Sequence, residues 1–557
     1  MKEKPIVYQF FWWVCLACPI ILYFLFVQVY GINIPYVDDH GLKGFIVKFY
    51  NSSSLGEKIS AVFAQHNEHR IGLTRILLLI IYTLKNEIDY KWLMWLGNGF
   101  LLGILGLFVA FFKKNKISYW YLLPIPWILF TLSNQENTFW GMASVQNFGI
   151  VFLCMWAFWE LENERIAWVL VLMTIAVFTS GNGFVALGII MGILILKQNW
   201  KQVGLVLGLS VILFLAYFLS YQKPPATPTA TLADWKDLIK AFMAFVGSYA
   251  DVTIETEISN RVLKAIALGG LLTTIALFFI TQNLPFDLAS KQLKISKKWP
   301  VFLLSTLALI FLSALMVAWS RLIGYGFQTI LTSRYKIYSI LLSISVYAWL
   351  LSVLQPKHQN KLFLIVLPLS ILTFINGFWQ SISQIDYHYK NLTTNMFNWT
   401  YEDLSGRKNT PTQFNYANPA TVFDKLVPTL LHSDFSNEPS IALEKAVLEN
   451  GNIAIRGTGD FRFPWLDPDN GVYLLAKSDR RAYLFPLRCL KSSIKNVVIQ
   501  QAIFSPIFEG QIPDFEFQAG VYHLGIIVVD NQHSRIYQTK DSIEIKANTN
   551  KKIATNW

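Results

Sequence analysis

Long apolar runs alternate with short polar segments over the first two thirds of the chain. Eleven of these runs are long enough, or bounded sharply enough by polar residues, to be predicted as membrane-crossing helices. The predicted crossings lie at 8–30, 92–112, 118–133, 145–160, 166–179, 184–196, 203–221, 261–281, 300–319, 336–355 and 362–380. The pattern therefore predicts an all-α polytopic membrane domain over residues 1–380.

Two longer stretches, 31–91 and 221–260, interrupt this series and are predicted as loops. Within the first loop, the apolar stretch Ile71–Leu84 is about fourteen residues long, which is short for a crossing and favours an interfacial or re-entrant helix. Within the second loop, the pattern predicts an amphipathic helix over 232–249 that would lie on the membrane as a lid.

The pattern changes after residue 380. Residues 381–437 are predicted as a helical or irregular connector, and residues 438–557 show short alternating runs separated by turn residues, as β-strands do. The predicted strands are 452–456, 472–476, 482–487, 497–501, 521–529, 535–539 and 542–545. Short strands at this spacing favour a mainly β, sandwich-like domain.

Composition agrees with a membrane protein joined to a soluble domain. Hydrophobic residues make up 54% of the 557 positions and charged residues only 15%, which excludes an ordinary cytosolic enzyme. The formal net charge of +12 raises the question of nucleic acid binding. Because the lysines gather in short runs between apolar spans, where membrane topology places them, we predict no nucleic acid partner.

Lysine runs orient the predicted helices. If the N-terminus is cytoplasmic and Ile71–Leu84 does not cross, the major lysine runs between spans all face the cytoplasm, as the positive-inside rule requires. These runs lie at 113–116, 197–201, 291–298 and 357–361. The C-terminal domain is then outside, and we predict a multi-pass protein of the bacterial inner membrane.

The same parity places polar residues other than lysine at the outer face. The outer segments include 38–70, 133–137, 180–183 and 321–335. One-sided enrichment of acids, amides, imidazoles and guanidinium groups is typical of an outward-facing site built from several helix ends.

An acidic pair follows the first crossing in the sequence PYVDDH at 35–40. The nucleotide-binding and hydrolase motifs of soluble enzymes are missing. The acidic pair, the amphipathic first outer loop, about eleven spans and the C-terminal outer domain resemble membrane glycosyltransferases of the GT-C superfamily, such as protein O-mannosyltransferases, aminoarabinose transferases and bacterial glucosyltransferases. The resemblance covers the architecture to about residue 380 and implies a sugar donor linked to polyprenyl phosphate.

By this resemblance, Asp38 or Asp39 is the catalytic carboxylate that accepts the proton of the attacking hydroxyl, with inversion at the sugar. The second carboxylate would orient that hydroxyl, bind the sugar or hold a cation. Mg²⁺ or Mn²⁺ bound through Asp39 and Glu68 is left open. The alternative for Asp39 is an N-cap of a helix that begins near His40.

The sequence QHNEHR forms a second polar cluster in the first loop. Helical spacing would place His66 and Arg70 on one face and Glu68 near Arg75. We predict that Arg70 and Arg75 bind the donor phosphate at headgroup depth. His66, Glu68 and His69 are predicted to contact the substrate. The alternatives are snorkelling arginines and a local Glu68–Arg75 salt bridge.

Outer helix ends add further candidates. A carboxylate, an amide and an aromatic ring follow the third crossing and are typical of sugar-binding sites. These residues are Glu136, Asn137 and Trp140. The GT-C resemblance implies a basic residue against the donor phosphate near the ninth and tenth crossings, where Arg321 and Arg334 lie, and Arg334 is the favoured ligand. Tyr335 is predicted to stack on the substrate or to hydrogen-bond with it. The alternative for Trp140 and for Arg334-Tyr335 is an anchor at the membrane interface.

The resemblance therefore predicts an inverting glycosyltransferase that moves a sugar from a polyprenyl-phosphate donor in the membrane lipid to an extracytoplasmic glycan, lipid or protein acceptor. A lipid-linked oligosaccharide flippase or transporter and a glycan polymerase are the alternatives. A transporter would place ionisable residues within its spans and show related halves, whereas the predicted spans are nearly free of charge.

Overall fold

Two compact units make up the chain. The computed structural model describes residues 6–546 except 224, 226, 253–255, 284–285, 288–291, 294–299, 402, 405–421, 426–440, 462, 464–466, 501 and 531–532. The first unit comprises Met1–Val27 and Gly41–Ser381, and the second comprises Gln28–His40 and Ile382–Trp557. Most of the predicted connector 381–437 beyond residue 400 lies outside the described residues.

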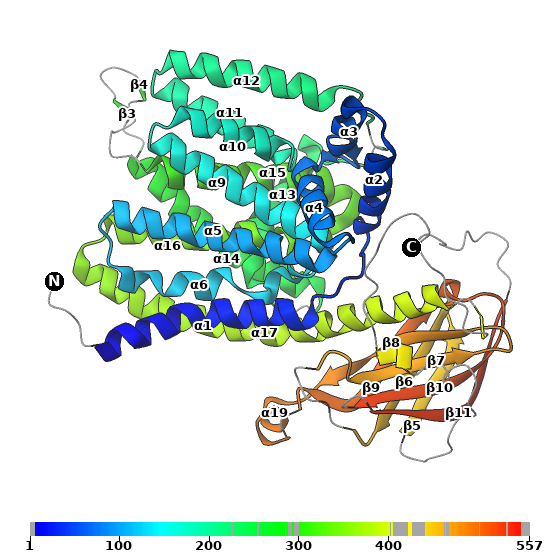
Figure 1. Ribbon diagram of the computed structural model, residues 1–557. Coiled ribbons are helices and arrows are strands. Elements are labelled where there is room, and N and C mark those ends of the chain that lie inside the picture. The colour runs from blue at the N-terminus through cyan, green and yellow to red at the C-terminus, as the bar shows by residue number, and fades with distance from the viewer. Residues whose placement is uncertain are drawn as a thin grey trace. The chain divides into compact units, whose positions relative to one another are not determined.

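The first unit is mainly helical (Figure 1). Among the described residues, eight helical segments are long and apolar enough to cross a membrane, as in a multi-pass membrane protein. Seven are α1 (Ile6–Tyr30), α5 (Tyr90–Lys114), α12 (Trp200–Phe218), α14 (Ile258–Asn283), α15 (Val301–Ile330), α16 (Lys336–Val353) and α17 (Pro356–Thr400), whose last part belongs to the second unit. The eighth, Gly141–Glu162, joins α8 (Gly141–Ala143), a π-helical turn (Ser144–Phe148) and α9 (Gly149–Glu162).

The three remaining predicted crossings take a shorter form. The run at 118–133 is divided into 3-10 turns at Tyr119–Leu122 and Leu132–Asn134 with α6 (Pro124–Leu129) between them. Prolines cannot donate hydrogen bonds to a preceding turn, so a new helix begins at Pro124. The other two runs form α10 (Ile166–Val177) and α11 (Asn182–Leu196), of 12 and 15 residues. Their crossing of a membrane stays a prediction.

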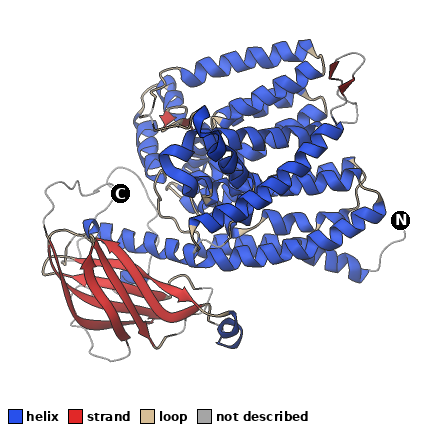
Figure 2. Ribbon diagram, turned by 180° about the vertical axis from the view of Figure 1, so that it is seen from behind, coloured by secondary structure: helices blue, strands red, loops and turns tan. Residues whose placement is uncertain are grey.

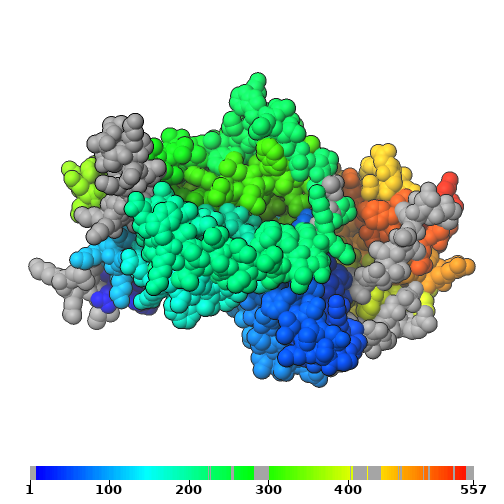
Figure 3. Space-filling view, turned by 90° about the horizontal axis from the view of Figure 1, so that it is seen from above, coloured from blue at the N-terminus to red at the C-terminus, as the bar shows by residue number. Residues whose placement is uncertain are grey.

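The first loop contains three helices, α2 (Asp39–Asn51), α3 (Leu55–Val62) and α4 (Gly72–Lys85). In the space-filling view the blue segment 41–85 forms a lobe beside α12 (Figure 3). Helix α4 has 14 residues, in agreement with the short helix predicted from Ile71–Leu84.

The sequence QHNEHR forms a tight hairpin, and its predicted helical geometry is wrong. Strand β1 (Gln65–His66) pairs antiparallel with β2 (His69–Arg70). Asn67 at the turn has a positive φ of 49°, which asparagine tolerates better than most residues because its side chain bonds locally. His66 and Arg70 therefore share no helical face, and Glu68 lies on the hairpin turn instead of on a helical face shared with Arg75.

The second loop contains the predicted amphipathic helix. A 3-10 turn (Leu232–Asp234) leads into α13 (Trp235–Val246), and a second turn (Ser248–Ala250) follows. The apolar face of α13 packs against α14 and α15. The helix is therefore part of the helical packing, whereas the sequence predicts a lid on the membrane surface. The contact with α14 is close: a Cβ atom added at Gly269 would overlap the carbonyl oxygen of Met243.

The second unit is built on a seven-stranded antiparallel sheet (Figure 2). Its strands are β5 (Ile441–Glu449), β6 (Asn452–Gly459), β7 (Gly471–Lys477), β8 (Ala482–Lys491), β9 (Phe504–Pro513), β10 (Gly520–Asp530) and β11 (His533–Ile545), in the order β11-β10-β7-β8-β9-β6-β5. The prediction of a mainly β domain is confirmed, but its sandwich-like arrangement is wrong, because one curved sheet forms a half-barrel. A further small hairpin, β3 (Phe286–Asp287) with β4 (Gln292–Leu293), belongs to the first unit.

The strand predictions hold in part. Six of the seven predicted strands fall within β6, β7, β8, β10 and β11, and β11 contains two of them, 535–539 and 542–545. Of the run predicted as a strand at 497–501, the described residues 497–500 lie in a helix, α19 (Ile494–Gln500), because a short apolar run fits either structure. The sequence pattern does not predict β5 or β9.

Helix α17 takes the place of a second sheet. Phe397 and Tyr401 at its end pack with Tyr473, Leu484 and Ile527 in the buried core of the second unit. The segment Gln28–His40 also packs on this helix, where Ile32 and Ile34 contact Leu392 and Met396. The polypeptide just before the acidic pair is thus part of the second unit.

We predict that Gly269→Ala destabilises the first unit by more than about 2 kcal/mol, because overpacking a helix contact displaces backbone. Gly270→Ala is the matched control, since a Cβ atom there meets nothing within 4 Å. The measurement is the thermal unfolding midpoint of both variants in detergent. Equal midpoints would contradict the close α13–α14 contact.

Candidate functional site

An acidic, a basic and an aromatic side chain meet at helix ends of the first unit. The Arg334 Nε atom lies 3.4 Å from Oε2 of Glu136, and both side chains are 40% exposed. The guanidinium carbon of Arg334 lies 5.5 Å from the centroid of the Trp140 ring. We call these three residues the Arg334 cluster. Its half-exposed charges remain accessible to a ligand.

Local secondary structure positions the cluster. Glu136 lies in the short helix α7 (Gln135–Thr138), and Arg334 lies in a 3-10 turn (Ser333–Tyr335) before α16. The Thr332 hydroxyl donates to Glu136 Oε2 at 2.6 Å, and the Glu136 amide donates to the Ser333 hydroxyl oxygen at 3.1 Å. These bonds hold the two segments together, although they are nearly two hundred positions apart in the chain.

Asn137 and Trp140 support the cluster from within the helical packing. The Asn137 amide nitrogen donates to the Arg334 carbonyl at 2.9 Å, and its oxygen accepts from Asn147 at 2.7 Å. Trp140 is only 6% exposed. This geometry indicates that Asn137 and Trp140 position Arg334. It favours that role over the direct sugar contact that the sequence predicts for both residues.

A second half-exposed ion pair joins the hairpin to α15. Arg321 Nη2 lies 3.2 Å from Glu68 Oε1, with side chains 29% and 44% exposed. Burial lowers the pKa of His69, Arg321 and His66 lower that pKa further, and Glu68 opposes the shift. His69 is therefore neutral at pH 7. Arg321 also interacts electrostatically with Tyr335, so the predicted residues Glu68, Arg321 and Tyr335 do come together.

Arg70 and Arg75 are engaged by backbone carbonyls. Arg70 donates at 2.5 Å to each of the carbonyl oxygens of Phe63, Tyr217 and Leu219. Arg75 donates at 2.5–3.2 Å to those of Ala61, Val62 and Ala64. These carbonyls lie at or just beyond the C-terminal ends of α3 and α12, where backbone acceptors are incompletely satisfied by the helix itself. The geometry favours capping over phosphate binding for both arginines.

The acidic pair lies on a strained turn. Val37 has a φ of 45°, which costs a β-branched residue about 1–3 kcal/mol. Asp39 is fully buried, and its Oδ2 atom accepts from the Tyr36 amide at 3.3 Å. Asp38 is only partly buried. Helix α2 begins at Asp39, and the bond from the Tyr36 amide ties this carboxylate to the turn that precedes the helix.

A buried ionic group that the sequence analysis does not identify lies beside the Arg334 cluster. Asp251 forms two bonds with Arg261, at 2.8 and 2.9 Å, and its Oδ2 atom lies 3.3 Å from the Lys336 ammonium. Lys336 and Asp251 are 2% and 0% exposed. The one available signal was a lysine directly after Arg334-Tyr335 at the start of an apolar run.

Burial raises the pKa of Asp251, but the bonds and charges of Arg261 and Lys336 outweigh this effect and leave the pKa below its ordinary value of 3.8. The carboxylate therefore stays charged at neutral pH. Because its folded pKa is lowered, its contribution to stability is complete above that ordinary value and is lost as the pH falls through the folded pKa.

Buried polar side chains also link α1, α5 and α7. The Tyr23 hydroxyl of α1 donates to Asn98 of α5 and lies 2.9 Å from the Thr138 hydroxyl. Asn98 in turn donates to the Thr138 carbonyl at 3.0 Å. The π-helical turn Ser144–Phe148 follows in the same region, and such turns occur frequently at functional sites.

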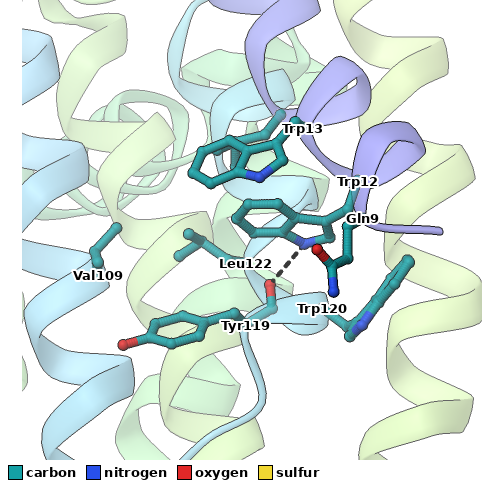
Figure 4. A pocket seen from close by; sticks show the side chains of 8 residues that line it. Gln9, Trp12, Trp13, Val109, Tyr119, Trp120 and Leu122 are labelled. Atoms are coloured by element: carbon teal, nitrogen blue, oxygen red, sulfur yellow. Dashed lines mark hydrogen bonds between the residues drawn. The ribbon is translucent and has the colours of Figure 1, made fainter. Parts of the chain in front are cut away.

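The apolar pocket in Figure 4 has a different character. It has a volume of about 470 Å³ and lies between the beginning of α1 and the segment around Tyr119. Its lining is largely aromatic, and the Trp12 indole donates to the Tyr119 carbonyl at 3.1 Å. The lining is almost entirely apolar, with Gln9 as its one amide side chain. The pocket therefore suits an acyl chain.

No group of three or more His, Cys, Asp or Glu side chains that could hold a metal ion occurs in the part of the chain that the structure describes. The Mg²⁺ or Mn²⁺ hypothesis for Asp39 and Glu68 stays a prediction.

No protein family model, curated protein or solved structure matches the chain. The case for its function therefore rests on its own residues and their geometry.

We predict that Asp251→Asn lowers stability by about 3–5 kcal/mol, because it leaves two buried cations without their carboxylate. The variant should also lose the part of the acid-side pH dependence that Asp251 contributes. The measurement is the unfolding free energy at pH 3 to 8.

The matched control is Asp237→Asn, which removes an ion pair to Lys240 whose side chains are 55% and 57% exposed. Exposed pairs contribute about 0–1 kcal/mol, so this variant should match the parent. The same loss in both variants would contradict the structural role of Asp251.

Proposed function

We propose that the chain is an inverting glycosyltransferase of the GT-C type that takes its sugar from a polyprenyl-phosphate carrier. The observation that carries the proposal is the Arg334 cluster, a half-exposed guanidinium beside a carboxylate at the end of an apolar helix. A guanidinium binds phosphate through two parallel hydrogen bonds. At headgroup depth, the phosphate within its reach is that of a lipid carrier.

Arg334 has a direct chemical role in this proposal. As the bond between the anomeric carbon and the phosphate oxygen breaks, negative charge develops on the leaving polyprenyl phosphate. Arg334 stabilises that charge. Glu136 and Trp140 hold the guanidinium in place, and Arg321, held by Glu68, is the second candidate cation.

Asp38 is the proposed general base. By the GT-C resemblance, it accepts the proton of the acceptor hydroxyl as that oxygen bonds to the anomeric carbon and displaces the phosphate with inversion. The partial exposure of Asp38 on the strained Val37 turn supports this choice. Asp39, which is buried against the Tyr36 amide, orients the turn.

The proposed topology has eleven crossings of the bacterial inner membrane, with the N-terminus in the cytoplasm and the C-terminal unit outside. The acceptor is then an extracytoplasmic glycan, lipid or protein. A lipid-linked donor suits such a site, because nucleotide sugars are cytoplasmic.

A lipid-linked oligosaccharide flippase is the second candidate, and one observation favours it. The Tyr23–Asn98–Thr138 group places polar side chains inside the helical packing, where a translocation path would have them. The group contains no charge, which is why the transferase is preferred over transport and over glycan polymerisation.

We predict that Arg334→Gln lowers kcat/KM for lipid-linked sugar by about 100-fold or more, because a charge-assisted bidentate contact is lost. Arg334→Lys should recover only part of this loss, since lysine keeps the charge without the fork. Arg165→Gln is the control, since Arg165 forms an ion pair with Glu160 but is 64% exposed. Full activity of Arg334→Gln would remove Arg334 from the mechanism.

We further predict that Asp38→Asn reduces kcat by about 10²–10⁴-fold, the usual contribution of a general base, with no change in the unfolding midpoint. Asp39→Asn should lower the midpoint as well. The exposed Asp479→Asn is the control for charge. If Asp39→Asn alone abolishes turnover at an unchanged midpoint, the roles of the two carboxylates are reversed.

A further inference from the structure

A polar pocket of about 590 Å³ lies within the second unit, between α17 and the sheet. Its volume falls in the usual range for small-molecule sites, about 300–1,000 Å³. All of its lining residues follow Ile382. The pocket is therefore separate from the Arg334 cluster.

One wall of the pocket is a row of charged residues across four neighbouring strands. Lys445 of β5 is directly opposite Arg456 of β6, Arg456 is opposite Glu509 of β9, and Glu509 is opposite Arg488 of β8. Directly opposite residues share one face of a sheet, and all four line the pocket. Two cations side by side are destabilising in a sheet, so their placement calls for a functional explanation.

The opposite wall comes from α17. Ser383, Gln384 and Tyr387 line the pocket, and spacings of three and four residues place them on one side of the helix. Tyr387 is 37% exposed. An aromatic ring beside an amide and a hydroxyl is the combination that contacts the ring and hydroxyl groups of a sugar.

One small side chain leaves room between these walls. Ala454 of β6 lines the pocket, and the backbone of Gly510 in β9 lies beside it. Ala454 is opposite Gln511 in the sheet, which adds a second amide to the lining. The cavity thus combines hydrogen-bonding groups with space for one or two sugar rings.

Lys445 and Arg456 of the row form weak, exposed ion pairs. Arg456 Nε lies 3.3 Å from Glu444 Oε2, with side chains 53% and 54% exposed. Lys445 pairs with Glu449, with exposures of 43% and 44%. Glu444 is the residue at a β-bulge in β5, and neither Glu444 nor Glu449 lines the pocket. An anionic ligand can replace such pairs at small cost.

We propose that this pocket binds a saccharide bearing an anionic group, either a carboxylate or a phosphate. The anionic group is held by Lys445 and Arg456, with Arg488 adding to the positive field. Tyr387, Gln384 and Glu509 contact the ring and its hydroxyls. The site is additional to the proposed transfer reaction, and its occupancy does not depend on catalysis.

The test is saturation-transfer NMR on the full chain in nanodiscs, at constant ionic strength. The probes are glucuronic acid, glucose 6-phosphate, glucose and inorganic phosphate. We expect at least one of the two anionic sugars to bind at least tenfold more tightly than both glucose and inorganic phosphate. The sugar that binds identifies the anionic group.

The variant for this test is Lys445→Gln with Arg456→Gln, which should weaken binding at least tenfold at an unchanged unfolding midpoint. The matched control is Arg535→Gln with Lys540→Gln, which removes two exposed cations from β11 at the other edge of the sheet. The control should bind as the parent does.

Four results would overturn the proposal: no saturable binding of either anionic sugar, equal affinity for glucose, equal affinity for inorganic phosphate, or undiminished binding in the Lys445→Gln, Arg456→Gln variant. Because the readout is binding, a failed transfer assay would leave this result unaffected.

Discussion

Removal of charge from water is the constraint on which the helical unit depends. A charge inside a packing of long apolar helices is tolerated only when protein groups replace its hydration. Lys336 and Arg261 meet this requirement through Asp251, and Arg70 and Arg75 meet it through backbone carbonyls. These groups tie helix ends together.

Exposure separates the structural charges from the chemical ones. The Lys336–Asp251 pair is almost fully buried, whereas Arg334 and Glu136 are each 40% exposed. A buried pair is costly to open, but a half-exposed pair can exchange partners with a ligand. The two kinds of pair occur side by side at the start of α16, so a rigid charged group directly supports an accessible one.

The sequence predicts the helical part well because apolar runs of membrane length have few other structures open to them. It predicts local detail less well. The hairpin at QHNEHR depends on the left-handed conformation of Asn67, and the division at Pro124 shortens a run that hydropathy treats as continuous. The sequence does not predict the half-barrel. Its sheet packs on the C-terminal half of α17, which falls in the stretch predicted as a connector.

For the candidate site too, residue types could be predicted from the sequence, but contacts between distant segments could not. Glu136, Trp140, Arg321 and Arg334 were recognised by residue type and by their predicted side of the membrane, yet only the fold brings Glu136 to Arg334 and Glu68 to Arg321. The ionic group around Asp251 was missed because its three members come from separate segments. The capping of Arg70 and Arg75 by carbonyls was equally invisible, since it requires the ends of two other helices.

The central claim is that a lipid-linked sugar is transferred and not merely moved across the bilayer. The most direct measurement uses purified protein in liposomes that contain polyprenyl phosphate carrying a radiolabelled hexose, with a mixed extracytoplasmic acceptor fraction on the outside. The account predicts that the label appears in the acceptor with inverted anomeric configuration while free polyprenyl phosphate is released in equal amount. Movement of intact donor between leaflets, with no release of polyprenyl phosphate, would contradict it.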